Sequence, residues 1–208
     1  MVKEKMELWQ YEQEAAQAGY GVICGCDEAG AGPLAGPVYA AAVVLPFGVK
    51  ISGLTDSKKL TEKKREQLFP QIQELALAYA VSSVSAEEID ATDILSARMK
   101  AMQLAIDALG EKLTVEFALI DGNRDHGKTA AITTEHRCII KGDSLSASVA
   151  AASVLAKVSR DHYMLEQAKC YPEYGFEKHK GYGTKAHYEA LRQYGPCPIH
   201  RRTFLKKL

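Results

Sequence analysis

The sequence predicts an α/β protein in which helices cover a mixed five-stranded sheet and a helical extension follows at the C-terminal end. Five apolar runs of strand length are spread along the chain, three early and two later, with helical patterns among them. The chain predicts a long helix over 144–168, and its stretch 144–158 is small and apolar nearly all round, which predicts burial on all sides there. With 208 residues, 47% of them hydrophobic, the chain is long enough for one sizeable core.

The first half of the chain begins with a Glu-, Gln- and Ala-rich stretch that predicts a helix over 4–18, ended by Gly19. Apolar runs then predict strands over 20–27 and 38–45. The Gly/Pro-rich segment between these strands is too long and irregular for a two-residue hairpin turn. Thr61 is the expected N-cap of a second helix. The residues that recur at helical spacing after it are Leu68, Ile72, Leu75 and Tyr79.

The second half of the chain continues with predicted strands and helices. Strands are expected over 79–85, 115–120 and 134–140, and helices over 93–109, 144–168 and 184–194. Gly110 ends the first of these helices, and Thr184 caps the last one. Near the end of the long helix, Arg160 and Asp161 are expected to form a structural ion pair.

Charge and cysteine content narrow the class of protein. Lys and Arg (26) balance Asp and Glu (26), so no overall basic field indicates nucleic-acid binding. Residues 170–208 hold eight basic and three acidic residues, which suits a phosphate-facing surface or simply a soluble basic tail. The five cysteines lack zinc spacing, so we expect free thiols in a reducing cytoplasm. The charged N-terminus and the lack of a membrane-length apolar run predict a cytoplasmic protein with no membrane partner.

Acidic residues stand at the ends of several predicted elements. Asp27 and Glu28 end the first predicted strand, Asp121 ends the fourth, and Asp143 opens the long helix. Ligands collect at the carboxyl ends of strands in open α/β sheets, so these four acids can converge there. Converging carboxylates repel one another unless hard cations neutralise them, and all-oxygen ligands favour Mg2+ or Mn2+. Such a site predicts metal-dependent phosphoryl chemistry. Scattered acids with structural roles are the alternative.

Two glycine-containing segments have the composition of binding loops. In the turn Gly30-Ala31-Gly32, the glycines supply positive φ angles and let main-chain groups approach a ligand closely. This turn lacks the third glycine of a dinucleotide site and the Gly-Lys-Ser/Thr ending of a P-loop. Around Lys180 and Tyr182, cations, an aromatic ring and flexible glycines suit phosphate and sugar binding. A solvated loop with Tyr182 packed on the domain is the alternative.

Taken together, five motifs closely resemble those of the ribonuclease HII family. In chain order they are Asp-Glu-Ala-Gly-x-Gly-Pro-Leu-Ala-Gly-Pro-Val (27–38), Asp-Ser-Lys-Lys-Leu (56–60), Leu-Ile-Asp-Gly-Asn (119–123), Lys-Gly-Asp followed by Ser-Val-Ala-Ala-Ala-Ser-Val-Leu-Ala-Lys-Val-x-Arg-Asp (141–161), and His-Lys-Gly-Tyr-Gly-Thr (179–184). The resemblance extends over about residues 20–205.

This resemblance implies a ribonuclease H-like fold. The catalytic domain would span 20–168, after a helical segment over 1–19 and before a substrate-binding extension over 169–208 that packs on the same domain. It also implies an endoribonuclease that cuts RNA–DNA hybrids and single ribonucleotides embedded in duplex DNA. Cleavage 5′ to the ribonucleotide would leave a 3′-hydroxyl and a 5′-phosphate. The processes that the resemblance implies are ribonucleotide excision repair and DNA replication. A hybrid nuclease that favours long RNA tracts, or a non-catalytic junction-binding protein, is the alternative.

The resemblance also assigns roles to residues. The catalytic and metal-binding acids are Asp27, Glu28, Asp121 and Asp143, which would hold two Mg2+ or Mn2+ ions. By analogy with the family, Asp27, Glu28 and Asp121 would hold metal most directly, and Asp143 would complete the second site. The turn at 30–32 would sense the 2′-hydroxyl mainly through main-chain atoms. Tyr182 would check the sugar, and Lys58 and Lys180 are further candidates for substrate binding.

One residue departs from the family's usual pattern, because Ala31 stands where the family usually has Arg. If recognition uses main-chain atoms, Ala31 preserves it. If the Arg side chain also holds a phosphate, the lost charged contact costs about 1.5–3 kcal/mol of affinity. The residues at 201–208 show no sliding-clamp peptide, and nothing in the sequence demands an oligomer, so a monomer is expected.

Overall fold

The structure, a computed structural model, describes residues 8–110, 113–123 and 132–206. The helices and strands follow one another as α2 (Gln10–Gln17), β1 (Ile23–Ala29), β2 (Val38–Val44), α3 (Glu62–Leu75), β3 (Ala78–Val84), α4 (Ala86–Ala91), α5 (Ile94–Leu109), β4 (Phe117–Asp121), β5 (His136–Ile139), α6 (Gly142–Leu145), α7 (Ala147–Cys170), α8 (Phe176–His179) and α9 (Lys185–Tyr194). Short 3-10 helices add η1 (Ser57–Lys59), η2 (Pro172–Tyr174) and η3 (Arg202–Phe204).

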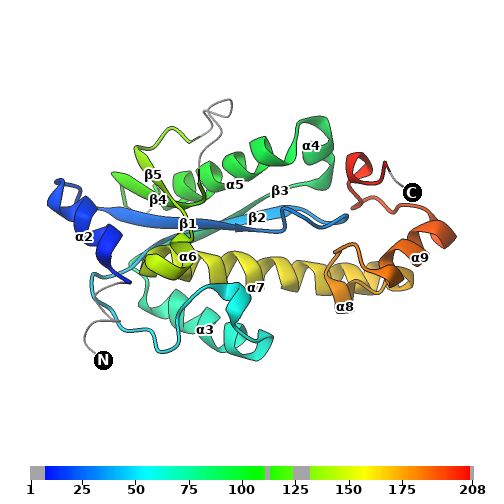
Figure 1. Ribbon diagram of the computed structural model, residues 1–208, viewed down its shortest axis with the longest axis horizontal. Helices are drawn as coiled ribbons and strands as arrows, with labels where there is room; N and C mark the ends of the chain where they lie inside the picture. The colour runs from blue at the N-terminus through cyan, green and yellow to red at the C-terminus, as the bar shows by residue number, and fades with distance from the viewer. Residues whose placement is uncertain (1–7, 111–112, 124–131, 207–208) are drawn as a thin grey trace.

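A five-stranded sheet in the order β3-β2-β1-β4-β5 runs through the middle of the molecule (Figure 1). β1 pairs antiparallel with β2, and β2 pairs antiparallel with β3. On the other side, β1 pairs parallel with β4, and β4 pairs parallel with β5. The sheet is therefore mixed and five-stranded, as the sequence predicts.

Helices cover both faces of this sheet (Figure 1). On one face lies α5, whose Met99 and Met102 belong to the same buried cluster as Cys24 and Cys26 of β1. On the other face lies α7, with α3 beside it, while α8 and α9 lie toward one end of the molecule (Figure 1). Side chains alternate along β1, so the cysteines face α5 and Gly25 between them faces α7.

At Gly25, α7 approaches β1 so closely that no side chain fits between them. A Cβ at this position would lie 2.2 Å from the backbone of Ser148 and Val149. The small, buried residues over 147–156 allow this approach and confirm the predicted burial on all sides for this part of α7, whereas the later turns of the helix carry exposed polar residues such as His162. The close contact places the start of α7, and the turn before it, against the middle of the sheet.

Two boundaries differ from the predicted ones in a way that affects the site. β1 continues to Ala29, so Asp27 and Glu28 lie inside the strand rather than at its end, and they point to opposite faces. Asp143 lies in α6, a separate helical turn, and Ser146 then caps α7. The predicted long helix is thus two helices with a break between them.

Other boundaries follow the pattern less closely. α3 ends at Leu75, which is 38% exposed, and Tyr79 lies in β3, so the predicted helical stripe is buried only at Leu68 and Ile72. α4 and α8 leave no periodic signal, because helices of one or two turns are too short to show one. The predicted first helix is α2, and its expected residues 4–7 lie outside the described residues. Among the described helices, none has both the length and the hydropathy that crossing a membrane requires.

Candidate metal centre and glycine turn

Three aspartates from distant parts of the sequence meet beside the sheet. β1 and β4 run parallel with Cys26 beside Ile120. The next residues, Asp27 and Asp121, therefore lie side by side on the face that α7 covers. The turn α6 brings Asp143 to them, and its backbone N–H lies 3.5 Å from Oδ1 of Asp121. Among the described residues, each of these three offers a carboxylate oxygen within 4.8 Å of the other two, and we call them the aspartate cluster.

Burial and mutual repulsion make it harder for the carboxyl groups of this cluster to be ionised together, which raises the pKa of Asp27 and of Asp143. Asp27 is 2% exposed, and burial, followed by the charges of Glu28 and Asp121, raises its pKa well above the usual value. Burial, Asp121 and Asp56 raise the pKa of Asp143 to about 6. A divalent cation would relieve this repulsion, and carboxylate oxygens are the ligands that Mg2+ and Mn2+ favour. The donor set therefore fits a hard divalent metal.

Glu28, the fourth predicted acid, points to the opposite face of β1. Its Oε1 lies 2.6 Å from Nη2 of Arg98 on α5. Burial raises the pKa of Glu28, the positive charge of Arg98 opposes this effect, and Asp121 adds to it. The structure thus brings three of the four predicted acids together and leaves Glu28 at their edge, bound to an arginine.

Of the two predicted substrate-binding lysines, Lys58 lies near the aspartate cluster. It belongs to η1, where the hydroxyl of Ser57 is 2.7 Å from that of Ser153 on α7. Partial burial lowers the pKa of Lys58, but the charges of the aspartate cluster outweigh this and raise it. The ammonium of Lys180, in contrast, donates to the backbone carbonyl of Glu177.

The glycine turn (residues 30–32) is held by its carbonyl groups. Gly30 has the expected positive φ, +97°, whereas Gly32 does not, and a Cβ on Gly30 would lie 2.0 Å from Nε of Arg160. Arg201 donates through Nη2 to the carbonyl of Gly30 at 2.6 Å and through Nη1 to that of Ala31 at 2.9 Å. Its Nε donates to the carbonyl of Gly36 at 2.9 Å. A residue near the end of the chain therefore shapes a turn near its start.

A second arginine, Arg160 of α7, holds the neighbouring backbone. It donates to the carbonyls of Pro37, Ala35 and Lys180 at 3.1, 3.0 and 3.0 Å. Both arginines are 0% exposed. Together they join the glycine turn, α7 and the C-terminal extension into one unit, with backbone carbonyls as their acceptors.

Sequence reasoning missed both of these arginines. The predicted ion pair between Arg160 and Asp161 is wrong, because Asp161 pairs with Lys157 at 2.6 Å and with Arg65 at 3.9 Å. Backbone acceptors leave no trace in a residue pattern. The one available signal is the Gly/Pro-rich segment itself, since carbonyls buried outside a sheet ladder require donors from elsewhere.

Tyr182 lies beside the glycine turn, so the two predicted binding loops form one surface. Its ring is 3.9 Å from the position that a Cβ on Gly32 would take, and the residue is 43% exposed. The guanidinium carbon of Arg160 lies 5.9 Å from the ring centroid. The backbone N–H of Leu34 donates to the carbonyl of Gly181 at 2.8 Å and joins the two loops directly.

A line of hydrogen bonds leads from the C-terminal segment to Tyr182. The N–H of Cys197 donates to Nδ1 of His200 at 2.9 Å. Nε2 of His200 lies 3.0 Å from Nε2 of His187, whose Nδ1 lies 2.9 Å from the carbonyl of Tyr182. All three contacts are hydrogen bonds only if both imidazoles are neutral. Nε2 of His200 then donates to Nε2 of His187, and Nδ1 of His187 donates to the carbonyl of Tyr182. Burial and the neighbouring His187 lower the pKa of His200 to about 4, in keeping with this state.

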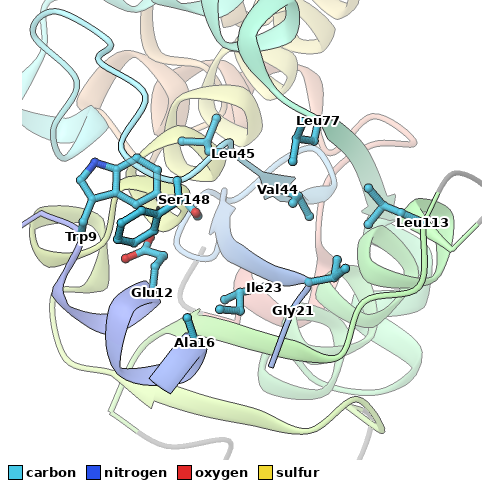
Figure 2. A pocket seen from close by; sticks show the side chains of 12 residues that line it. Trp9, Glu12, Ala16, Gly21, Ile23, Val44, Leu45, Leu77, Leu113 and Ser148 are labelled. Carbon is cyan, nitrogen blue, oxygen red and sulfur yellow. Dashed lines mark hydrogen bonds between the residues drawn. The ribbon is translucent and has the colours of Figure 1, made fainter. Parts of the chain in front are cut away.

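A cavity of about 220 Å³ lies at the other end of β1, away from the aspartate cluster (Figure 2). Trp9, Glu12 and Leu77 are among the residues that surround it in Figure 2, and none of the predicted site residues lines it. Oε1 of Glu12 accepts from Oγ of Ser146 at 2.6 Å and from the N–H of Ser148 at 2.9 Å. Glu12 therefore attaches α2 to the start of α7.

Comparison with known sequences gives one family name. A family profile described as ribonuclease HII matches residues 24–207. The ribonuclease HII of Caldicellulosiruptor bescii is 49% identical over 207 residues, which cover 100% of this chain and 98% of that protein. The ribonuclease HII of Shouchella clausii is 49% identical over 204 residues, which cover 98% of this chain and 76% of that protein.

Comparison with solved structures gives the same fold. The ribonuclease H2 from Pyrococcus horikoshii has a TM-score of 0.72 at 28% identity, over 88% of this chain and 93% of that one. The ribonuclease HII from Archaeoglobus fulgidus, solved in a complex with PCNA, has a TM-score of 0.72 at 24% identity, over 87% of this chain and 94% of that one. The sheet and its covering helices therefore form the ribonuclease H-like fold that the motifs imply.

Proposed function

Because the chain belongs to the ribonuclease HII family of metal-dependent endoribonucleases, we propose that it cuts the RNA strand of RNA–DNA hybrids and single ribonucleotides embedded in duplex DNA. Cleavage takes place 5′ to the ribonucleotide and leaves a 3′-hydroxyl and a 5′-phosphate. The observation that carries the proposal is the aspartate cluster, whose oxygens lie within 4.8 Å of one another. Nucleic acid is accordingly the proposed partner.

The acids divide into two groups in this proposal. Asp143 and Glu28 exchange the roles that the resemblance implies: Asp27, Asp121 and Asp143 hold metal most directly, because their oxygens lie together, and Glu28, paired with Arg98, completes a second site. When bound, Mg2+ or Mn2+ activates the attacking water and stabilises the leaving oxygen. The protein's own contribution is position, because β1 and β4 fix two of the aspartates side by side and α6 adds the third. Lys58 supplies a nearby positive charge for the phosphate that is to be cut.

The glycine turn and Tyr182 select the phosphate that reaches the metals. Gly32 is exposed and has no Cβ, so its main chain can touch a 2′-hydroxyl. The ring of Tyr182 stands next to it, partly exposed, and can stack on a sugar or base. The carbonyl of Ala31 is bound by Arg201, so the shape of the turn does not depend on the arginine side chain that the family usually has there.

The test uses end-labelled duplex DNA that contains one ribonucleotide, incubated with Mg2+ or Mn2+ and, as a control, with EDTA. We expect a single cut on the 5′ side of the ribonucleotide and no cut in EDTA. A mixture of products at several positions, or cutting that persists in EDTA, would contradict the proposal.

A long RNA–DNA hybrid serves as the second substrate and separates the alternatives. Cleavage of the hybrid alone would indicate a nuclease for long RNA tracts, and Ala31→Arg would then test whether the missing side chain is the cause. Binding of the ribonucleotide-containing duplex without cleavage of either substrate would leave a non-catalytic junction-binding protein.

A further inference from the structure

Glu28 and Arg98 form an ion pair in which each partner keeps an unused group. Nη2 of Arg98 lies 2.6 Å from Oε1 of Glu28. Among the described residues, Oε2 of Glu28 and Nε of Arg98 are buried and have no hydrogen-bond partner. A guanidinium and a carboxylate can form two parallel hydrogen bonds, and a permanent structural clamp would be expected to use both. This pair is only half made, at the edge of the aspartate cluster.

The position of the pair puts Arg98 in competition with a cation. Glu28 follows Asp27 directly on β1 and is close enough to Asp121 for their charges to repel. Arg98 comes from α5 on the opposite face of the sheet, so it draws the Glu28 carboxylate away from the aspartates. A carboxylate oxygen that accepts from a guanidinium at this distance must give up that bond before it binds a metal.

We propose that Arg98 is a positioning residue that holds Glu28 in the metal-free protein and is displaced from it when divalent metal binds. This inference rests on the proposed metal centre and adds a built-in competitor to it. Arg98 neutralises Glu28 while the site is empty, which avoids a buried, unpaired carboxylate. The cost appears as weaker metal binding, so Arg98 sets the metal concentration that the enzyme requires.

The test measures Mn2+ binding by titration calorimetry and thermal unfolding in EDTA, neither of which requires catalysis. Arg98→Met removes the charge and keeps much of the side-chain volume. We expect it to bind Mn2+ about tenfold more tightly than the wild type, since a hydrogen bond to a charged group is worth about that factor. Its unfolding temperature in EDTA should fall, and the fall should shrink when Mn2+ is present. The matched control is Lys100→Met. Lys100 lies two residues after Arg98 on α5 and forms an ion pair with Glu88 of α4, so its replacement should leave Mn2+ affinity unchanged.

A second pair of variants separates competition for Glu28 from a general loss of positive charge. In a Glu28→Gln background the carboxylate is gone, so Arg98→Met should change Mn2+ affinity by less than about twofold. An equal gain in both backgrounds, or no gain in the wild-type background, would overturn the proposal. If Arg98→Met does not fold, Arg98→Gln is compared instead; it removes the charge but keeps a neutral hydrogen-bond donor, and it should bind Mn2+ more tightly than the wild type because a neutral hydrogen bond to Glu28 is weaker than a charged one. Absence of saturable Mn2+ binding to the wild type would instead reject the metal centre itself.

Discussion

Each aspartate of the cluster owes its position to a different local feature. Asp27 faces the cluster because side chains alternate along β1. Asp121 lies beside it because β4 runs parallel to β1 and ends at this residue. Asp143 depends on Lys141, which has a φ of +60° and starts the turn α6. A left-handed conformation is costly for a residue with a side chain, and such strain collects at functional sites.

Asp121→Asn should abolish cleavage without unfolding the protein. The amide keeps the size of the side chain but removes the charge at the centre of the cluster, and metal-assisted stabilisation of a transition state is worth several kcal/mol. We expect cleavage of the single-ribonucleotide duplex to fall by about a thousandfold or more. Asp107→Asn, an exposed acid on α5, is the control and should retain full activity. An active, folded Asp121→Asn would show that the cluster is not the catalytic centre.

Arg201→Met should damage both stability and junction recognition. The change removes the donors for three carbonyls, those of Gly30, Ala31 and Gly36. Each buried carbonyl left unpaired costs about 1–3 kcal/mol, so we expect the unfolding free energy from urea titration to drop by about 3 kcal/mol or more. The ratio of single-ribonucleotide to long-hybrid cleavage should also fall. Arg202→Met changes the exposed neighbour and should alter neither quantity; equal effects of the two changes would contradict the assigned role.

At the scale of elements, α7 connects the parts of the site. It packs against β1 at Gly25, bonds to η1 through Ser153, and holds the backbone next to the glycine turn through Arg160. The first helical turn of α7 is attached to α2 by Glu12, whose Oε1 accepts from the N–H of Ser148. A small shift of α7 would therefore change the positions of the aspartate cluster and of the glycine turn together.

Gly25→Ala tests this close packing. The added Cβ would lie 2.2 Å from the backbone of Ser148 and Val149, so α7 or β1 has to move. Overpacking of this kind costs about 1–3 kcal/mol, and we expect a loss near the upper limit in urea unfolding, with reduced cleavage. Gly21→Ala is the control, because its Cβ would meet only the side-chain oxygens of Glu116, at 3.4 and 3.9 Å. Wild-type stability in Gly25→Ala would mean that the helix and the strand are not in rigid contact.

His200 should make stability depend on pH between about 6.5 and 4. Its pKa is lowered to about 4 in the folded protein, so the unfolded chain takes up protons first as the pH falls below 6.5. The stability that the neutral ring provides is present above pH 6.5 and is lost on the way to pH 4, by about 2 kcal/mol at pH 5. Burial and the nearby His187, Arg202 and His179 oppose a positive charge on this ring and lower its pKa, whereas a backbone hydrogen bond with Cys197 acts in the other direction.

The measurement is urea unfolding at pH 7.5 and pH 5. His200→Asn should be less stable than the wild type at pH 7.5 but should lose less on acidification. His162→Asn, an exposed histidine of α7, should keep the wild-type difference between the two pH values. If His200→Asn shows the full wild-type loss at pH 5, another group is responsible for the pH dependence.

At the scale of the whole molecule, the two binding loops come together from opposite ends of the chain. The glycine turn follows β1, whereas Tyr182 and Arg201 belong to the C-terminal extension. The extension has its own buried cluster, which includes Phe176 and Leu191 and takes in Leu34 and Ala35 from the turn region. The separation of residues 169–208 from the main domain remains a prediction, and this shared cluster argues for close packing between the two parts.

Divalent metal should stabilise the whole protein. A ligand that binds only the folded state adds about 2.7 kcal/mol at one hundred times its dissociation constant, or about 5–10 °C of unfolding temperature for a chain of this length. We expect Mn2+ or Mg2+ to raise the unfolding temperature by this amount over EDTA. K+ at equal ionic strength is the control, and Asp121→Asn should reduce the shift. An unchanged unfolding temperature in saturating Mn2+ would contradict binding at the aspartate cluster.

The sequence was sufficient for the sheet and for the apolar first part of α7, because periodicity is a local property. The convergence of Asp27, Asp121 and Asp143 could be expected from the general rule that ligands collect at the carboxyl ends of strands in α/β sheets. The sequence did not predict the position of Glu28. The predicted strand ends at residue 27, but β1 continues to Ala29, and neighbouring side chains in a strand point to opposite faces, so Glu28 points away from Asp27. The sequence also contained no hint of Arg98 as the partner of Glu28, or of Arg160 and Arg201 as donors to the turn. Those contacts depend on three-dimensional packing and on backbone acceptors, which have no sequence signature.

The distance along the chain between the glycine turn and Arg201 has a consequence for biosynthesis. The turn leaves the ribosome early, but the guanidinium that binds the carbonyl of Ala31 is translated 170 residues later. The nascent polypeptide thus contains all four acids before it contains the arginine that shapes the glycine turn. Vectorial folding can assemble the sheet first, while the glycine turn reaches its final shape, and with it the proposed junction recognition, only when translation has passed Arg201.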